Sequence, residues 1–163
     1  VATELGIEEV VKLDFPTMSL ESASLQELIP AIAKVFLEYQ PNIVYTLNRS
    51  DVHSDHRITF EAVFSCTKSF RFPFIKKVLM YECISETEFS PALAENVFIP
   101  NYFVDISKYM DAKIKIMSIY ESEMGEHPFP RSNRNIKALA TFRGATAGVE
   151  YAEAFQMLKY IDK

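Results

Sequence analysis

Along the chain, segments whose apolar residues have the spacing of a helix alternate with segments whose apolar residues have the spacing of a strand. Residues 28–39 carry apolar side chains at the i, i+3, i+4 and i+7 spacing of an amphipathic helix. Ser24 and Glu27 are spaced as a capping box before it, whereas Pro30 fits only in a first turn and favours a later start. Residues 43–47 are apolar and β-branched, which is typical of a parallel strand buried between helices.

The rest of the chain continues this alternation. Ala2–Leu5 followed by Gly6 indicates the end of a helix, and residues 151–160 are compatible with either a strand or a helical segment. The pattern predicts strands at 10–13, 78–81 and 102–104, and helices at 55–68, 107–117 and 132–148, the last two capped by Ser107 and Ser132. We therefore expect an α/β, three-layer, Rossmann-like domain with a mostly parallel sheet. No repeat or linker is visible, so residues 1–163 are expected to form a single domain.

Composition narrows the class of protein. The chain has 163 residues, of which 48% are hydrophobic, enough for one globular core. A net charge of −5 argues against a nucleic-acid surface, and no apolar run approaches the roughly 20 residues of a membrane span. Cys66 and Cys83 have no metal-binding or redox spacing, so we expect reduced thiols and a cytoplasmic location.

One segment concentrates candidate chemistry. Residues 51–57, Asp-Val-His-Ser-Asp-His-Arg, follow the predicted strand at the edge where α/β sheets place ligand sites. His56 would open the next helix, so its imidazole and that of His53 can face one crevice. A neutral imidazole is a good zinc ligand, and Asp55 could accept the other ring N–H of His56.

A structural explanation of the same residues stays open. His and Asp are ordinary residues in a polar turn, and a helix N-terminus favours Asp. His127 lies in a proline-rich turn, which predicts an exposed loop residue without chemistry. The sequence contains no glycine-rich phosphate loop and no nucleophile elbow.

The surroundings of this segment resemble the PIG-L/LmbE family of zinc-dependent N-deacetylases. The resemblance begins with residues 41–57, and the opening residues 2–6 are similar to the helix end before the third strand of the family. Further matching stretches follow in the order of the family, at residues 98–107, 120–122, 130–132, 143–144 and 151–155.

The resemblance implies a function and roles for individual residues. Members of the family remove acetyl groups from N-acetylglucosamine-type sugars and glycoconjugates, with zinc held by two histidines and an aspartate. By motif, His56 would be the downstream zinc ligand. His53, as an imidazolium, would stabilise the oxyanion, and Asp55 would be its orienting or electrostatic partner.

The sequence departs from the family at one point. The family carries its other zinc ligands and its general base in a His-Pro-Asp-Asp motif, which is absent here. We therefore expect residues 1–163 to be the C-terminal part of a deacetylase domain that lacks its N-terminal strand-helix-strand unit and is inactive alone. The alternative is a metal-free sugar-binding or structural relative. A homo-oligomer is compatible with either interpretation.

Overall fold

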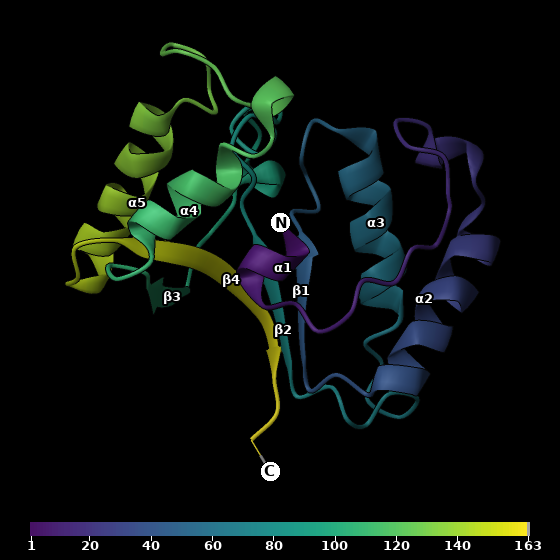
Figure 1. The fold of residues 1–163 in the computed structure, drawn as a ribbon. Helices are drawn as coiled ribbons and strands as arrows, with labels where there is room; N and C mark the ends of the chain where they lie inside the picture. The colour runs from purple at the N-terminus through teal and green to yellow at the C-terminus, as the bar shows by residue number, and fades with distance from the viewer. Residues whose placement is uncertain (163) are drawn as a thin grey trace. The chain divides into compact units, whose positions relative to one another are not determined.

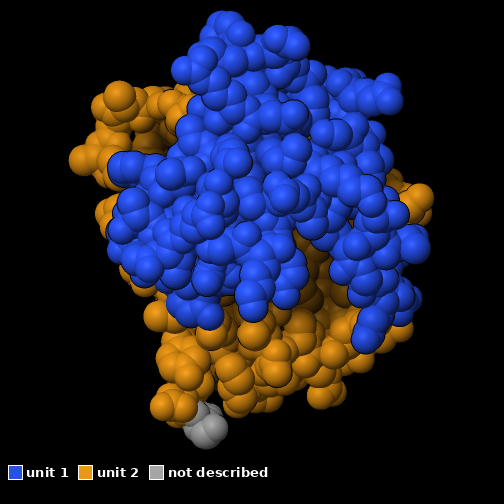
Figure 2. Space-filling view, turned by 60° about the vertical axis from the view of Figure 1, so that its left-hand side comes forward, with its two compact units in different colours: residues 1–10, 102–154 blue, residues 11–101, 155–163 orange. Residues whose placement is uncertain are grey.

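A computed structural model describes residues 1–162. Contacts divide the chain into two compact units, which Figure 2 colours blue and orange. Residues 1–10 and 102–154 form unit 1, and residues 11–101 with the chain end from residue 155 form unit 2. The candidate segment 51–57 belongs to unit 2.

Unit 2 is a small α/β layer structure. Its helices α2 and α3 lie side by side along β1 and β2 (Figure 1). Short 3-10 turns precede α2 and follow β2. The elements are η1 (Leu20–Ser22), α2 (Leu25–Tyr39), β1 (Ile43–Leu47), α3 (Ser54–Ser65), β2 (Lys77–Tyr81) and η2 (Ala94–Asn96).

The sheet is mixed. β1 and β2 are parallel, with Val44 opposite Val78. β4 (Ala152–Tyr160) runs antiparallel to β2, with Met80 opposite Gln156, and an irregularity lies between Val78 and Leu79. Hydrogen-bonded neighbours follow the order β1-β2-β4-β3. The predicted α/β fold is thus confirmed, although β4 makes the sheet less parallel than expected.

The core of unit 2 lies between its helices and its strands. The inward side chains of β1 and β2 pack against apolar residues of both helices and of the 72–75 turn. Burial alternates along β1, because successive side chains of a strand point to opposite faces of the sheet. The fully or nearly fully buried members are Leu28, Ile32, Val44, Ala62, Cys66, Phe72, Ile75 and Val78.

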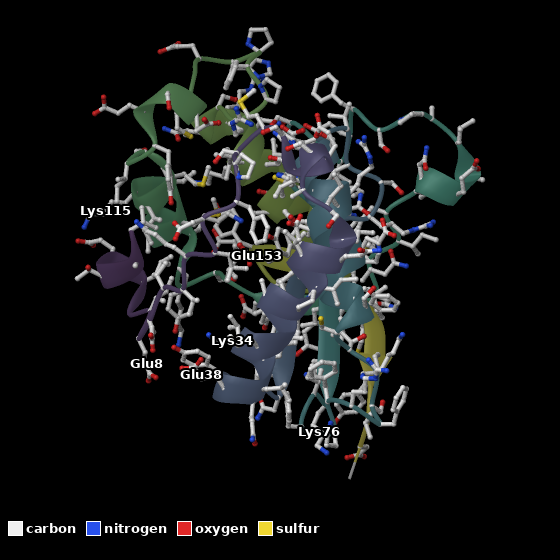
Figure 3. The ribbon with its side chains drawn as sticks, turned by 90° about the vertical axis from the view of Figure 1, so that its right-hand side faces the viewer. Glu8, Lys34, Glu38, Lys76, Lys115 and Glu153 are labelled. Carbon is white, nitrogen blue, oxygen red and sulfur yellow. The ribbon has the colours of Figure 1, made fainter. Side chains whose placement is uncertain are left out.

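The start of α2 follows the predicted capping box. The Ser24 side chain and the Glu27 carboxylate satisfy each other's backbone N–H groups at the helix start. The helix already begins at Leu25, so the expectation that Pro30 delays it is wrong, and the proline lies inside the helix. Lys34 and Glu38 lie one turn apart on its exposed side (Figure 3).

Unit 1 contains the remaining elements: α1 (Ala2–Leu5), β3 (Tyr102–Asp105), α4 (Met110–Met117), η3 (Glu121–Glu123), α5 (Asn133–Ala147) and the first residues of β4. Lys115 of α4 pairs with Glu4 of α1 at 3.3 Å, both exposed (Figure 3 labels Lys115). Ser132 caps α5, as predicted. A Cβ at Gly144 would lie 2.6 Å from the carbonyl oxygen of Glu150, so the close return of the chain requires glycine there.

Three local expectations are decided by the structure. Residues 10–13 form no strand, and their exposed side chains have no sheet partner among residues 1–162. Ser107 does not cap α4; its hydroxyl donates to Asp105, and the helix starts at Met110. The undecided segment 151–160 is mostly the strand β4. Within residues 1–162, no helix combines the length and the apolar character needed to cross a membrane.

Candidate functional site

The loop after β1 buries a carboxylate. The Asp51 side chain is fully buried, with 0% exposed. One oxygen accepts the Thr87 hydroxyl at 2.6 Å, and the other lies 2.8 Å from Nδ1 of His56. A buried carboxylate needs such partners, because desolvation without them is costly. Asp51 is therefore held by both neighbours and in turn holds the imidazole.

His56 has one ring nitrogen fixed and the other free for a ligand. An ionised carboxylate can only accept, so a neutral His56 donates its Nδ1–H to Asp51 and keeps the lone pair on Nε2. The side chain is 21% exposed. A metal-ligating histidine usually donates its other ring N–H to a carboxylate. This ring therefore has the chemistry of a zinc ligand.

His53 occupies the N-cap position of α3. Its Nδ1 accepts the backbone N–H of Asp55 at 3.1 Å, in place of the oxygen that usually caps a helix. An accepting Nδ1 carries no proton, so this hydrogen bond matches the neutral tautomer with its hydrogen on Nε2. The predicted imidazolium would form by protonation of Nδ1 and would give up this cap; it stays a prediction. The neutral Nε2–H is still a hydrogen-bond donor.

The two imidazoles lie together. The ring centroids of His53 and His56 are 5.0 Å apart, and the planes differ by 16°. The prediction that both histidines lie at one place, just past the carboxyl end of β1, is confirmed. Side by side they offer one lone pair and one N–H donor.

Asp55 has a different set of partners from the one predicted. Its carboxylate accepts the backbone N–H groups of Met18 at 2.7 Å and Leu20 at 3.0 Å. The prediction that Asp55 accepts the second ring N–H of His56 is wrong, because Asp51 does so. Asp55 contacts His53 through its backbone amide and not through its carboxylate.

A second loop braces the first from the carboxyl end of β2. Thr87 connects two segments, because its Oγ1 donates to Asp51 and accepts the N–H of Cys83 at 2.8 Å. The N–H of Val52 donates to the carbonyl of Glu86 at 3.1 Å. The Arg57 guanidinium donates to two carbonyls of the same loop, at 2.7 and 2.6 Å. The loop backbone is thus fixed at Asp51 and Val52.

Tyr81 ends β2 near this network. Burial raises the pKa of its phenol to about 12, and the nearby Cys83 and Asp51 add to the shift in the same direction. Tyr81 is therefore a neutral phenol at physiological pH, and it cannot act as a base there.

The residues described here supply one prepared metal ligand. No three His, Cys, Asp or Glu residues among residues 1–162 come close enough to hold a metal ion. A zinc site has at least three protein ligands, so His56 fits one position of such a site and the described residues do not complete it.

Sequence reasoning missed two residues of the site. Asp51 lies inside the candidate segment 51–57, but the two residues are joined across a turn, and no periodic pattern in the sequence indicated their contact. Thr87 comes from a loop with no motif, so nothing in the sequence indicated it. His127, expected to be an exposed loop residue, is exposed.

Comparisons with known proteins identify relatives. The profile of the PIG-L family, GlcNAc-PI de-N-acetylase, matches residues 1–67, which include both histidines. Diacetylchitobiose deacetylase of Thermococcus kodakarensis is 25% identical over 160 residues, which cover 94% of this chain and 58% of that protein. The chain thus spans less than two thirds of the length of this relative.

Solved structures share the fold. The N,N'-diacetylchitobiose deacetylase from Pyrococcus horikoshii, solved with its inhibitor MPG, matches with a TM-score of 0.72 at 20% identity, covering 97% of this chain and 60% of that one. The 4-carboxy-2-hydroxymuconate hydratase GalB from Pseudomonas putida matches with a TM-score of 0.59 at 18% identity, covering 85% and 60%. Two reactions on one fold mean that the function has to be argued from the site.

Proposed function

Because the chain belongs to the PIG-L family, we propose that it is part of an amide hydrolase that removes the N-acetyl group from an N-acetylglucosamine-type sugar or glycoconjugate. Water would add to the acetamide carbonyl, the C–N bond would break, and acetate and a free amine would leave. The proposal extends to this chain the substrate class named for the Thermococcus relative.

The observation that carries the proposal is the pair of imidazoles with opposite hydrogen-bonding capacity. Asp51 leaves His56 with a free Nε2 lone pair, and the amide of Asp55 leaves His53 with an Nε2–H. Amide hydrolysis requires a carbonyl to be polarised and an oxyanion to be stabilised. One ligand nitrogen and one donor at the same place meet both needs.

We assign each histidine one role. His56 would be one zinc ligand, and its orientation would be maintained by Asp51. His53 would donate its Nε2–H to the oxygen on which negative charge develops. When bound, zinc would supply the Lewis acid that polarises the carbonyl.

We place the remaining zinc ligands and the general base outside the described residues. His56 alone cannot hold the metal. The curated relative is longer than this chain, which leaves room for further ligands in the whole protein. On this proposal residues 1–163 alone would not turn over substrate.

Two variants of the whole protein test the roles. Exchanging His56→Ala should remove most of the bound zinc, because a site that loses one of its few protein ligands competes poorly with water. Exchanging His53→Ala should leave the zinc content near wild type and lower kcat by about 10²–10³, the typical loss for one oxyanion donor. Elemental analysis gives the zinc content, and acetate release from N,N'-diacetylchitobiose gives turnover.

His127→Ala is the matched control. It removes an exposed histidine of unit 1, and both zinc content and turnover should stay at wild-type values. If His53→Ala and His56→Ala also retain zinc and activity, the histidine pair is only a polar helix start. Sugar binding without acetate release would favour the metal-free sugar-binding alternative.

A further inference from the structure

Asp55 joins two segments that are distant in the sequence. Its carboxylate accepts the N–H groups of Met18 and Leu20, which lie 37 and 35 residues earlier. One residue away, the Ser54 hydroxyl donates to Glu21 at 3.1 Å. The η1 turn packs against α3 at the same place. Residues 17–22 are therefore fastened to the first turn of the helix that carries His56.

The fastening depends on the carboxylate of Asp55. The residue is only 9% exposed, and each of its oxygens accepts a backbone N–H. Hydrogen bonds to a charged acceptor are stronger than neutral ones. Two further ties hold the segment: the Ser54–Glu21 hydrogen bond, which is exposed to solvent and contributes little, and the packing of the Leu20 side chain against the core.

The backbone of the fastened segment is strained. Met18 has φ 60°, a left-handed conformation that is uncommon for a side chain of this kind. Its side chain gains little from burial, because Met18 is 75% exposed. A strained residue persists only where its surroundings determine it. The hydrogen bond from the Met18 amide to Asp55 is one contact that holds this conformation.

The same residue also touches the candidate site. The N–H of Asp55 donates to Nδ1 of His53, which fixes the tautomer of that ring. Asp55 thus contacts His53 with its backbone and residues 17–22 with its side chain. Both of its oxygens are occupied by this segment, so its carboxylate is not directed at His53.

We propose that Asp55 is a positioning residue whose carboxylate holds residues 17–22 as a fixed wall against the first turn of α3, the helix that carries His56. The proposal deepens the proposed function and rests on it for its effect on activity. It differs from a direct role for Asp55 in the chemistry, because the group that it acts on is a backbone segment.

Hydrogen exchange of individual amides tests the wall directly. In Asp55→Ala, the Met18 and Leu20 amides should exchange about tenfold to a hundredfold faster, the loss expected for bonds to a charged acceptor. In Asp55→Asn, whose side chain keeps one acceptor oxygen, the acceleration should be intermediate. The Val78 and Leu79 amides in the core should keep their wild-type rates in both variants.

A matched control is available close by. Glu27 is also a carboxylate that accepts a backbone N–H, that of Ser24 at 3.2 Å, and the hydroxyl that it accepts also belongs to Ser24. Glu27→Gln should leave the exchange of Met18 and Leu20 unchanged. Unchanged exchange of these two amides in Asp55→Ala, or an equal acceleration throughout the core, would overturn the proposal.

Activity supplies the second readout. In the whole protein, kcat/KM for N,N'-diacetylchitobiose should fall in the order wild type, Asp55→Asn, Asp55→Ala, in step with the exchange rates. A fall in kcat/KM of the same size in both variants, without graded exchange, would overturn the positioning role. If the wild-type protein releases no acetate, the proposed function fails, while the exchange experiment still decides whether Asp55 holds the wall.

Discussion

At the scale of single residues, the imidazole of His56 depends on a carboxylate that the solvent does not reach. Asp51 fixes the ring through Nδ1 and is itself fixed by Thr87. Removing such a partner from a metal-ligating histidine typically costs about 10–100-fold in metal affinity. We expect this loss in Asp51→Asn of the whole protein, measured by competition with a zinc chelator.

The hydroxyl of Thr87 offers a graded comparison. Thr87→Ser keeps the donor to Asp51 and should leave zinc affinity close to wild type, whereas Thr87→Val leaves the carboxylate short of a partner. The ¹⁵N chemical shifts of His56 in the metal-free protein give a readout independent of zinc. An unchanged Nδ1–H tautomer together with unchanged affinity in Asp51→Asn would show that this carboxylate does not orient the ring.

Which carboxylate serves which histidine could not be derived from the sequence. Asp51 and Asp55 flank His53 at equal distances along the chain, and either could in principle accept from His56. The choice is made by the loop at residues 83–90, which brings Thr87 to Asp51, and by residues 17–22, which take up Asp55. Both are long-range contacts without a periodic signal.

At the scale of elements, β1 contains an unusual polar position. Thr46 is 3% exposed, and its hydroxyl has no hydrogen-bond partner within residues 1–162. A buried polar group without a partner lowers stability. Thr46→Val keeps the β-branched shape and should raise the free energy of unfolding by up to about 1 kcal/mol.

The matched substitution lies at the end of α3. Thr67 is 6% exposed, and its hydroxyl donates to the carbonyl of Phe64 at 2.8 Å. Thr67→Val removes that bond and should lower the free energy of unfolding by about 1 kcal/mol. Urea denaturation of the two variants should therefore shift the midpoint in opposite directions. Equal shifts would mean that Thr46 is satisfied in solution.

Elements with a strong local signal were predictable, and those shaped by distant contacts were not. α2 with its capping box, β1 and α5 with Ser132 follow from periodicity and capping chemistry. Residues 10–13 have strand-like composition but find no sheet neighbour among residues 1–162. Strand formation requires a partner, which composition alone does not supply.

At the scale of the whole molecule, the length of the chain and the order of its strands both bear on the edge of β1. The chain spans 58% of the length of the Thermococcus deacetylase, and β1 stands at one end of the strand order. The outer edge of β1 therefore has no strand neighbour among residues 1–162. Its outward side chains are apolar, with Ile43 41% and Tyr45 53% exposed. An apolar edge strand is a template for association with another chain.

We therefore expect residues 1–163, produced alone, to self-associate through β1 and to melt without clear cooperativity. Ile43→Lys places a charge on this edge and should shift the protein toward monomer, because charged edge positions oppose strand pairing. Leu37→Lys is the matched control, since Leu37 is a similarly exposed apolar residue, at 56%, that belongs to α2 and not to a strand. Sedimentation velocity over a range of concentrations gives the mass distribution of each variant.

If Leu37→Lys dissociates the chain as well as Ile43→Lys does, association is due to general surface hydrophobicity. If the unmodified chain is monomeric and melts in one cooperative transition, the edge of β1 needs no further strand.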